Sequence, residues 1–95
     1  MRIQIVTCNN KYTDGKYTES YHEIHEIDNL NGLNHSISTV KNIIHDNLLY
    51  KPENCMLESV IISGDDSNII DNIIGHFIMN PIGVIIHSAE TACMV

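Results

Sequence analysis

The sequence has few of the residues that mark the common functional classes of small proteins. It has no tryptophan, one phenylalanine and five basic residues, and its apolar runs are only a few residues long. Such runs are far shorter than the roughly 20 apolar residues of a membrane-spanning helix. Direct binding of DNA or RNA is disfavoured, because it needs clustered cations and the five bases are scattered along the chain.

The number and spacing of the three cysteines also exclude common kinds of stabilising site. Cys8, Cys55 and Cys93 are odd in number and share no close spacing, which argues against a disulfide framework or a structural zinc site. The first residues lack the apolar segment of a signal peptide, so we expect a cytoplasmic location, in a bacterium or an infected host cell. No phosphate-binding or dinucleotide-binding glycine motif is present, and no cofactor is expected.

The chain has enough apolar residues to form one folded unit, and it has a strong excess of acidic residues. Its 95 residues are 43% hydrophobic, which predicts a single domain over residues 1–95. The formal net charge is −7. An acidic surface of this kind suits either plain solubility or a basic partner.

The clearest local signal is a repeated tripeptide on either side of Asp14-Gly15, in the segment Lys-Tyr-Thr-Asp-Gly-Lys-Tyr-Thr. Asp-Gly between two β-prone runs predicts a hairpin with a type I′ turn. Pairing of Thr13 with Lys16, continued without interruption, would set Ile5 opposite Ile24. The apolar content falls toward the turn, so the hairpin should project a polar tip beyond the core.

The remaining pattern predicts an α+β fold with the order β-β-α-β-α-β. Strands are expected over residues 2–8, 16–27, 58–63 and 82–87, and amphipathic helices over about 34–49 and 67–79. The last strand is nearly all apolar, which favours a central place in the sheet. We therefore expect a two-layer sandwich in which both helices cover one face of a four-stranded mixed sheet.

Polar residues at the ends of three expected strands form one candidate site. If the first strand lay parallel to the last two, Cys8, Asp65, Asp66, His87 and Glu90 would meet at one edge of the sheet. The three acids could then hold a hard cation such as Mg²⁺, with Cys8 or Ser88 as nucleophile and His87 as base. The simpler alternative is that Asp65 and Asp66 only cap the helix that follows them.

The second expected strand and the hairpin tip form the other candidate site, a protein-binding surface. Its carboxylates could meet lysines and arginines of a partner, or could only protect an edge strand from self-pairing. The tyrosines of the tip could be binding anchors or could only stabilise the ribbon. The predicted partner-binding residues are Lys11, Tyr12, Lys16, Tyr17, Glu19, Tyr21, Glu23 and Glu26.

These features favour a non-enzymatic function. The leading hypothesis is a small acidic binding protein that neutralises a partner with a basic surface by occlusion, as an immunity protein or a viral counter-defence inhibitor of a nucleic-acid-handling complex would. One alternative is a small metal- or nucleotide-dependent enzyme that uses the strand-end residues. Another is a structural subunit of a homo-oligomer, for which a homodimer is the simplest form.

Overall fold

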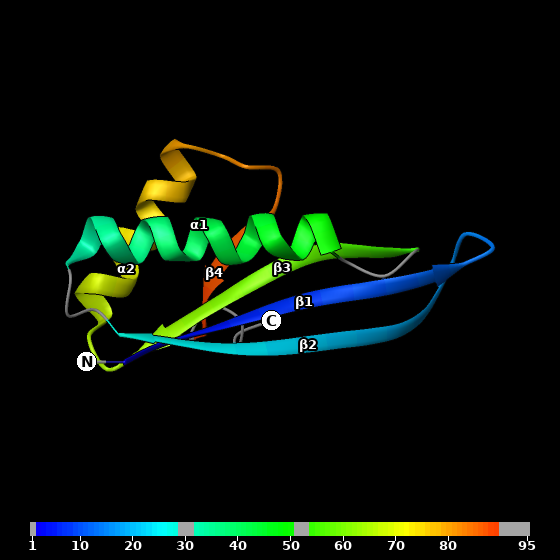
Figure 1. The fold of residues 1–95 in the computed structure, drawn as a ribbon, viewed down its shortest axis with the longest axis horizontal. Helices are drawn as coiled ribbons and strands as arrows, with labels where there is room; N and C mark the ends of the chain where they lie inside the picture. The colour runs from blue at the N-terminus through cyan, green and yellow to red at the C-terminus, as the bar shows by residue number, and fades with distance from the viewer. Residues whose placement is uncertain (1, 29–31, 51–53, 90–95) are drawn as a thin grey trace.

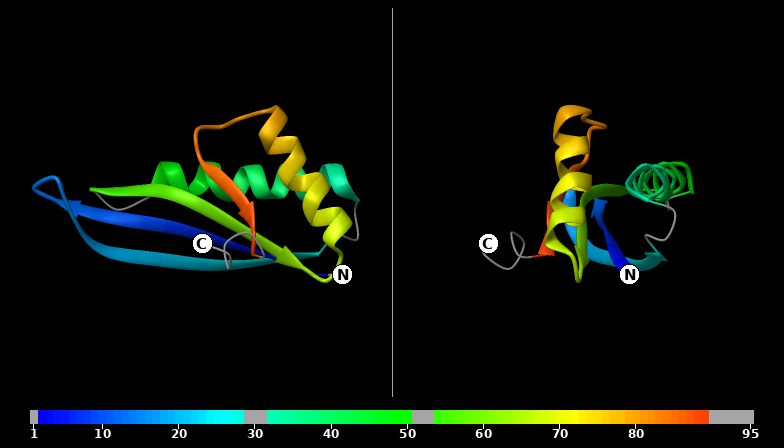
Figure 2. Two further views of the ribbon diagram at one scale, coloured as in Figure 1. Left: turned by 180° about the vertical axis from the view of Figure 1, so that it is seen from behind. Right: turned by 90° about the vertical axis from the view of Figure 1, so that its left-hand side faces the viewer.

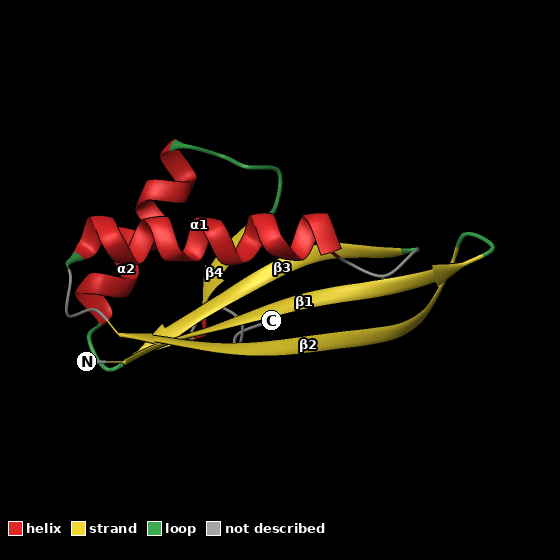
Figure 3. Ribbon diagram, in the orientation of Figure 1, coloured by secondary structure: helices red, strands yellow, loops and turns green. Residues whose placement is uncertain are grey.

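The computed structural model describes residues 2–28, 32–50 and 54–89 and confirms the predicted element order. The chain is an α+β fold in which two helices lie on one face of a four-stranded mixed sheet (Figures 1 and 3). The elements are β1 (Arg2–Thr13), β2 (Lys16–Asp28), α1 (Leu33–Tyr50), β3 (Cys55–Gly64), α2 (Ser67–Met79) and β4 (Ile85–Ser88).

The strand order is β2-β1-β3-β4, and β1 is antiparallel to both of its neighbours. Among the described strands, β3 and β4 form the parallel pair, and α2 connects them. The prediction that the last strand is central was wrong, because β4 is a four-residue edge strand. The two isoleucines of β4 lie on opposite faces of the sheet. Ile86 packs against the core, whereas Ile85 is 68% exposed on the other face.

The core lies between the helices and one face of the sheet, which we call the helix face. Ile3 and Ile5 of β1 and Val60 and Ile62 of β3 are almost fully buried there. Val40 and Ile44 of α1 and Ile73 and Phe77 of α2 pack onto them from above. Full burial of an aliphatic side chain contributes roughly 1.5–3 kcal/mol, so these residues supply much of the stability. On the opposite side of the sheet, which we call the open face, neither α1 nor α2 is present (Figure 2).

The tip of the β1–β2 hairpin, residues 12–17, extends past the end of α1 and the start of β3 as a short two-stranded arm (Figure 1). At its tip Asp14 and Gly15 have φ angles of 53° and 77°, as a type I′ turn requires. Thr13 pairs with Lys16 and Tyr12 with Tyr17, as the turn predicted. The arm contributes to an elongated molecule with principal extents of 43 × 29 × 23 Å.

Beyond the tip the predicted register is wrong by one residue. A β-bulge at Thr18 shifts the pairing, so Ile3 lies opposite Ile27 and Ile5 opposite His25. The Thr18 hydroxyl donates to the Lys11 carbonyl oxygen at 3.2 Å, which satisfies one backbone acceptor at the bulge. A one-residue shift moves each β2 side chain beyond Thr18 to the face opposite the predicted one. The bulge therefore brings Ile27 to the core, where an uninterrupted register would have placed Glu26 beside Ile3.

Candidate protein-binding surface

The eight predicted partner-binding residues lie on β1 and β2, but they are divided between the two faces of the sheet. Cross-strand neighbours share a face, and Lys11 is paired with Glu19, while Tyr21 lies opposite Asn9 and Glu23 opposite Thr7. All of these positions are on the helix face. The open face receives the Tyr12–Tyr17 pair and, farther along β2, Glu26. Alternation along a strand thus turns one expected patch into two.

On the open face, Tyr12 connects the arm to the rest of the sheet. Its hydroxyl donates to Oε1 of Glu58 in β3 at 2.7 Å, and its ring meets that of Tyr17 edge-on, with centroids 6.3 Å apart. The hydrogen bond to the Glu58 carboxylate raises the pKa of Tyr12 above its usual 10.0, with burial as a smaller cause. Tyr12 is half-buried and structural, whereas Tyr17 is 57% exposed and remains available for contact.

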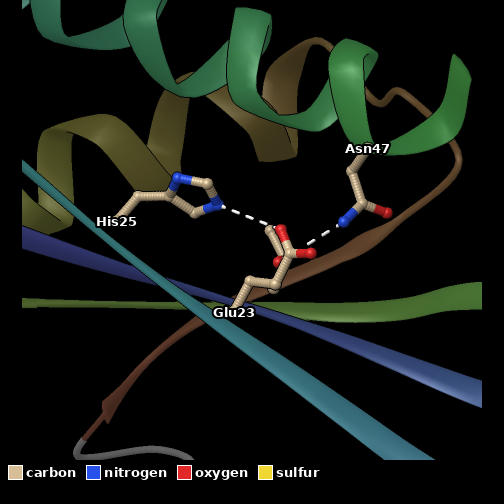
Figure 4. Close-up of polar contacts among 4 residues, drawn as sticks. Glu23, His25 and Asn47 are labelled. Atoms are coloured by element: carbon tan, nitrogen blue, oxygen red, sulfur yellow. Dashed lines mark hydrogen bonds and ion pairs between the residues drawn. The ribbon is translucent and has the colours of Figure 1, made fainter. Parts of the chain in front are cut away.

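On the helix face, the acids of β2 contact neighbours on the same strand, the exposed Tyr21 and the half-buried His25. Tyr21 donates its hydroxyl to the Glu19 carboxylate, and this bond raises the pKa of Tyr21. Oε2 of Glu23 lies 3.6 Å from Nε2 of His25 (Figure 4). Exposed pairs of this kind contribute little to stability. The two carboxylates can therefore exchange these neighbours for cations of a partner at small cost.

The outer edge of β2 is the longest exposed backbone edge in the described part of the chain. Eleven of its 13 residues are exposed, and only His25 and Ile27 are half-buried. Glu19 and Glu23 border this edge on the helix face. Glu26 borders it on the open face, where its Oε2 is 3.6 Å from Nη1 of Arg2. The two patches therefore meet along one strand edge that has carboxylates on both sides.

A group of buried polar side chains lies under the second half of α1, and the sequence pattern did not single it out. Nδ2 of Asn47 reaches down from α1 to Oγ1 of the fully buried Thr7, at 3.4 Å (Figure 4). Asn9 is 5% exposed, and Oδ1 of both asparagines has no hydrogen-bond donor among the described residues. The sequence did contain one indication of this group: Thr7 and Asn9 continue the every-second-residue pattern of Ile3 and Ile5, and so they face the same side of the sheet.

The predicted strand-end site is not assembled. It required β1 to be parallel to β3, but the two strands are antiparallel, and Ile3 rather than the end of β1 pairs with Gly64. Cys8 therefore lies in the middle of the sheet, between His22 and Ser59. Antiparallel pairing follows from the chain path, because β3 returns beside β1 after α1 has crossed the helix face.

The remaining members of that site point to separate places. Asp66 caps α2, since its Oδ1 accepts from the backbone N–H groups of Asn68 and Ile69 at 3.0 and 3.4 Å. In β4, His87 pairs with Ile61 on the open face, whereas Ser88 pairs with Ile62 on the helix face. Glu90 is outside the described residues. Within those described, no three His, Cys, Asp or Glu side chains are grouped closely enough to hold a metal ion.

A small pocket of about 100 Å³ does lie at the carboxyl ends of β3 and β4, beside the first turn of α2. Its polar lining residues are Ser63, Ser67, Asp71 and Ser88, and Ile62 and Ile70 are among the apolar ones. It lacks Asp65, Asp66 and His87, so it does not reproduce the predicted chemistry.

Comparison with known proteins leaves the site to be interpreted from its own geometry. The chain matches no family model, no curated protein and no solved structure. For the residues that the structure covers, neither α1 nor α2 combines the length and the hydropathy of a membrane-crossing segment.

Proposed function

We propose that this chain is a small acidic binding protein that neutralises a partner protein by occluding a basic surface. It would act in the cytoplasm of a bacterium or an infected host cell, as an immunity protein or a counter-defence inhibitor. The proposed binding surface is the β2 edge together with the tip of the arm. It involves no cofactor and no direct contact with nucleic acid or membrane.

The observation that carries the proposal is the exposed 13-residue edge of β2. An edge strand offers unpaired backbone N–H and C=O groups, to which an extended segment of another protein can add as a further strand. The carboxylates of Glu19, Glu23 and Glu26 border that edge on both faces of the sheet. A partner along the edge would meet them whichever face its own side chains occupy.

The sign of the charge supports a basic partner and opposes self-pairing through this edge. Two copies of β2 side by side would bring like charges together, which is destabilising. A strand or surface rich in lysine and arginine would instead be attracted, and charge complementarity would raise its association rate. In a nucleic-acid-handling complex, such cations are the groups that normally contact phosphate.

Exposed aromatic side chains of the kind that commonly anchor binding lie at and near the tip of the arm. Tyr17 and Tyr21 are 57% and 42% exposed; Tyr17 lies on the open face, whereas Tyr21 shares the helix face with Lys11 and Lys16. Tyrosine offers a large contact area for two rotatable bonds. Because the arm projects past α1, it can enter a concave site on a partner while β2 covers the rim.

A capture experiment from host-cell extract tests the proposal. The immobilised chain is compared with the triple variant Glu19→Lys, Glu23→Lys, Glu26→Lys, and bound proteins are quantified by mass spectrometry at low and high salt. We expect the parent to capture a basic protein at low salt, with less at high salt. The variant should capture at least about tenfold less, because three charge pairs of roughly 0.5 kcal/mol each are lost.

The matched control is the triple variant Asp46→Lys, Asp65→Lys, Asp71→Lys, whose exposed acids lie outside β1 and β2. Three substitutions of two charges each move both variants from −7 to −1. The control should keep the captured protein. Equal capture by the parent and the β2 variant contradicts the proposal, and so does equal loss in the two variants.

A further inference from the structure

The open face of the sheet has an apolar centre made from two neighbouring rows of side chains. In the first row Val6 lies between Ile24 of β2 and Ile61 of β3, and His87 of β4 follows Ile61. The second row, read in the same direction across the sheet, is His22, Cys8, Ser59 and Ile85. All four strands therefore contribute to one surface.

This apolar centre is separate from the core. Val6, Ile24, Ile61 and Ile85 are absent from the cluster of buried and half-buried residues that pack under the helices. Ile24 and Ile85 are 64% and 68% exposed, although isoleucine is among the residues most often found inside proteins. Both helices lie on the other side of the sheet (Figure 2). A contiguous apolar surface of this kind marks an interaction site.

The charges on the open face leave its centre neutral. Glu26 is paired with Arg2 at one end of the face, and Glu58 accepts a hydrogen bond from Tyr12 toward the other. The two rows between them contain no Asp, Glu, Lys or Arg. For a chain of net charge −7, this is a surface through which a second copy can approach with little repulsion.

The size of the face is close to the smallest that a specific dimer needs. Three strands of about ten residues, each about 33 Å long and 4.8 Å wide, together with the four-residue β4, cover roughly 500 Å². A pair of copies would therefore bury on the order of 1,000 Å², the size that a specific interface is expected to reach.

We propose that the open face is the interface of a homodimer, with a two-fold axis parallel to the strands between β1 and β3. That axis lays β1 of one copy over β3 of the other, so that Val6 faces Ile61 of the second copy. Ile24 then faces His87, and His22 faces Ile85, so each outer isoleucine packs on an imidazole. Two sheets packed face to face in this way resemble a β-sandwich. The backbone edges of both β2 strands and the helix-face carboxylates of Glu19 and Glu23 remain free in this dimer, whereas Glu26 and Tyr17 lie on the face that it uses.

Light scattering and sedimentation over a concentration series test the proposal. We expect the parent chain to reach twice its mass of 10.7 kDa as its concentration rises. The variant Ile24→Lys, Ile85→Lys should dissociate about tenfold or more readily, because buried charge would replace interface anchors. The matched control Leu49→Lys, Ile78→Lys changes residues on the helices that are 74% and 70% exposed, and it should still dimerise.

Circular dichroism and thermal melting separate loss of the dimer from loss of the fold, and each single lysine variant is measured beside the pair. A parent chain that stays monomeric throughout overturns the proposal. So does a dimer that survives both lysine substitutions but is lost on Ser20→Pro in β2, because that result would place the contact at the strand edge.

Discussion

The hydroxyl of Tyr12 donates a 2.7 Å hydrogen bond to Oε1 of Glu58, across 46 residues of sequence. This bond and the backbone bond from Tyr12 N–H to the Asn54 carbonyl oxygen, at 3.0 Å, tie the arm to the start of β3. The arm is therefore held in place close to its tip, where it would otherwise be a two-stranded ribbon of marginal stability. A fixed arm loses little conformational entropy when it binds.

The first prediction concerns the ionisation of Tyr12. Its pKa is raised above 10.0 because ionisation would break the bond to Glu58 and set two negative charges side by side. The folded state alone favours the protonated phenol, so this stabilisation is present below about pH 10 and is lost as the pH rises through the raised pKa. Spectrophotometric titration should show two late-ionising phenols, those of Tyr12 and Tyr21, and Tyr12→Phe should remove one of them. Glu58→Gln should return the pKa of Tyr12 toward 10.0, and an unchanged titration curve in that variant would contradict the assignment.

The second prediction tests the register set by the bulge. Ile27 packs against the core, whereas Ile24 is 64% exposed on the open face. Ile27→Ala should lower the free energy of unfolding by about 1–2 kcal/mol, less than the cost for a fully buried isoleucine. Ile24→Ala, the same change three residues away, should alter it by no more than about 0.5 kcal/mol. Urea unfolding of dilute protein measures both changes. A larger loss of stability for Ile24→Ala than for Ile27→Ala would contradict the bulge and support the uninterrupted register.

The third prediction separates the two neighbouring aspartates before α2. Asp66→Ala removes the acceptor of two backbone N–H groups and should cost about 1 kcal/mol of stability. Asp65→Ala makes the same chemical change at an exposed position that does not cap the helix, and it should cost less than about 0.5 kcal/mol. Thermal unfolding of the two variants gives the comparison. Equal costs would show that the helix is not capped by Asp66.

The fourth prediction concerns the turn at the arm tip. Gly15 has φ 77°, and an added Cβ would meet nothing within 4 Å, so Gly15→Ala carries a purely conformational penalty of roughly 1 kcal/mol. Asp14→Asn should be neutral or slightly stabilising, because asparagine readily adopts the positive φ of 53° found there. Amide hydrogen exchange localises the effect: Gly15→Ala should speed exchange near the tip and leave α2 unchanged. Faster exchange throughout the chain would mean that the turn is needed for the whole fold.

Sequence reasoning succeeded where a few neighbouring residues determine the structure. The Asp14-Gly15 turn, the capping by Asp66 and the order of strands and helices all follow from local patterns. It failed where distant segments decide the outcome. The bulge at Thr18 is selected by the need to bury Ile27 rather than Glu26, which is a property of the assembled sheet.

The same distinction explains the outcome for the candidate sites. The strand-end site depended on the relative direction of β1 and β3, which no local pattern encodes, and the antiparallel pairing separates Cys8 from the ends of β3 and β4. The eight partner-binding residues remain predictions. Their division between two faces follows from strand alternation and the bulge, and so does the continuous edge along which the two patches meet.

The most direct test of the account is amide hydrogen exchange of this chain, free and bound to the protein that it captures. The account predicts that exchange slows along β2, where a partner strand would accept and donate backbone hydrogen bonds, and at the tip around Tyr17. Exchange in α2 should not change. Slowing confined to the helices, with β2 exchanging as fast as in the free chain, would contradict the claim that the β2 edge is the binding surface.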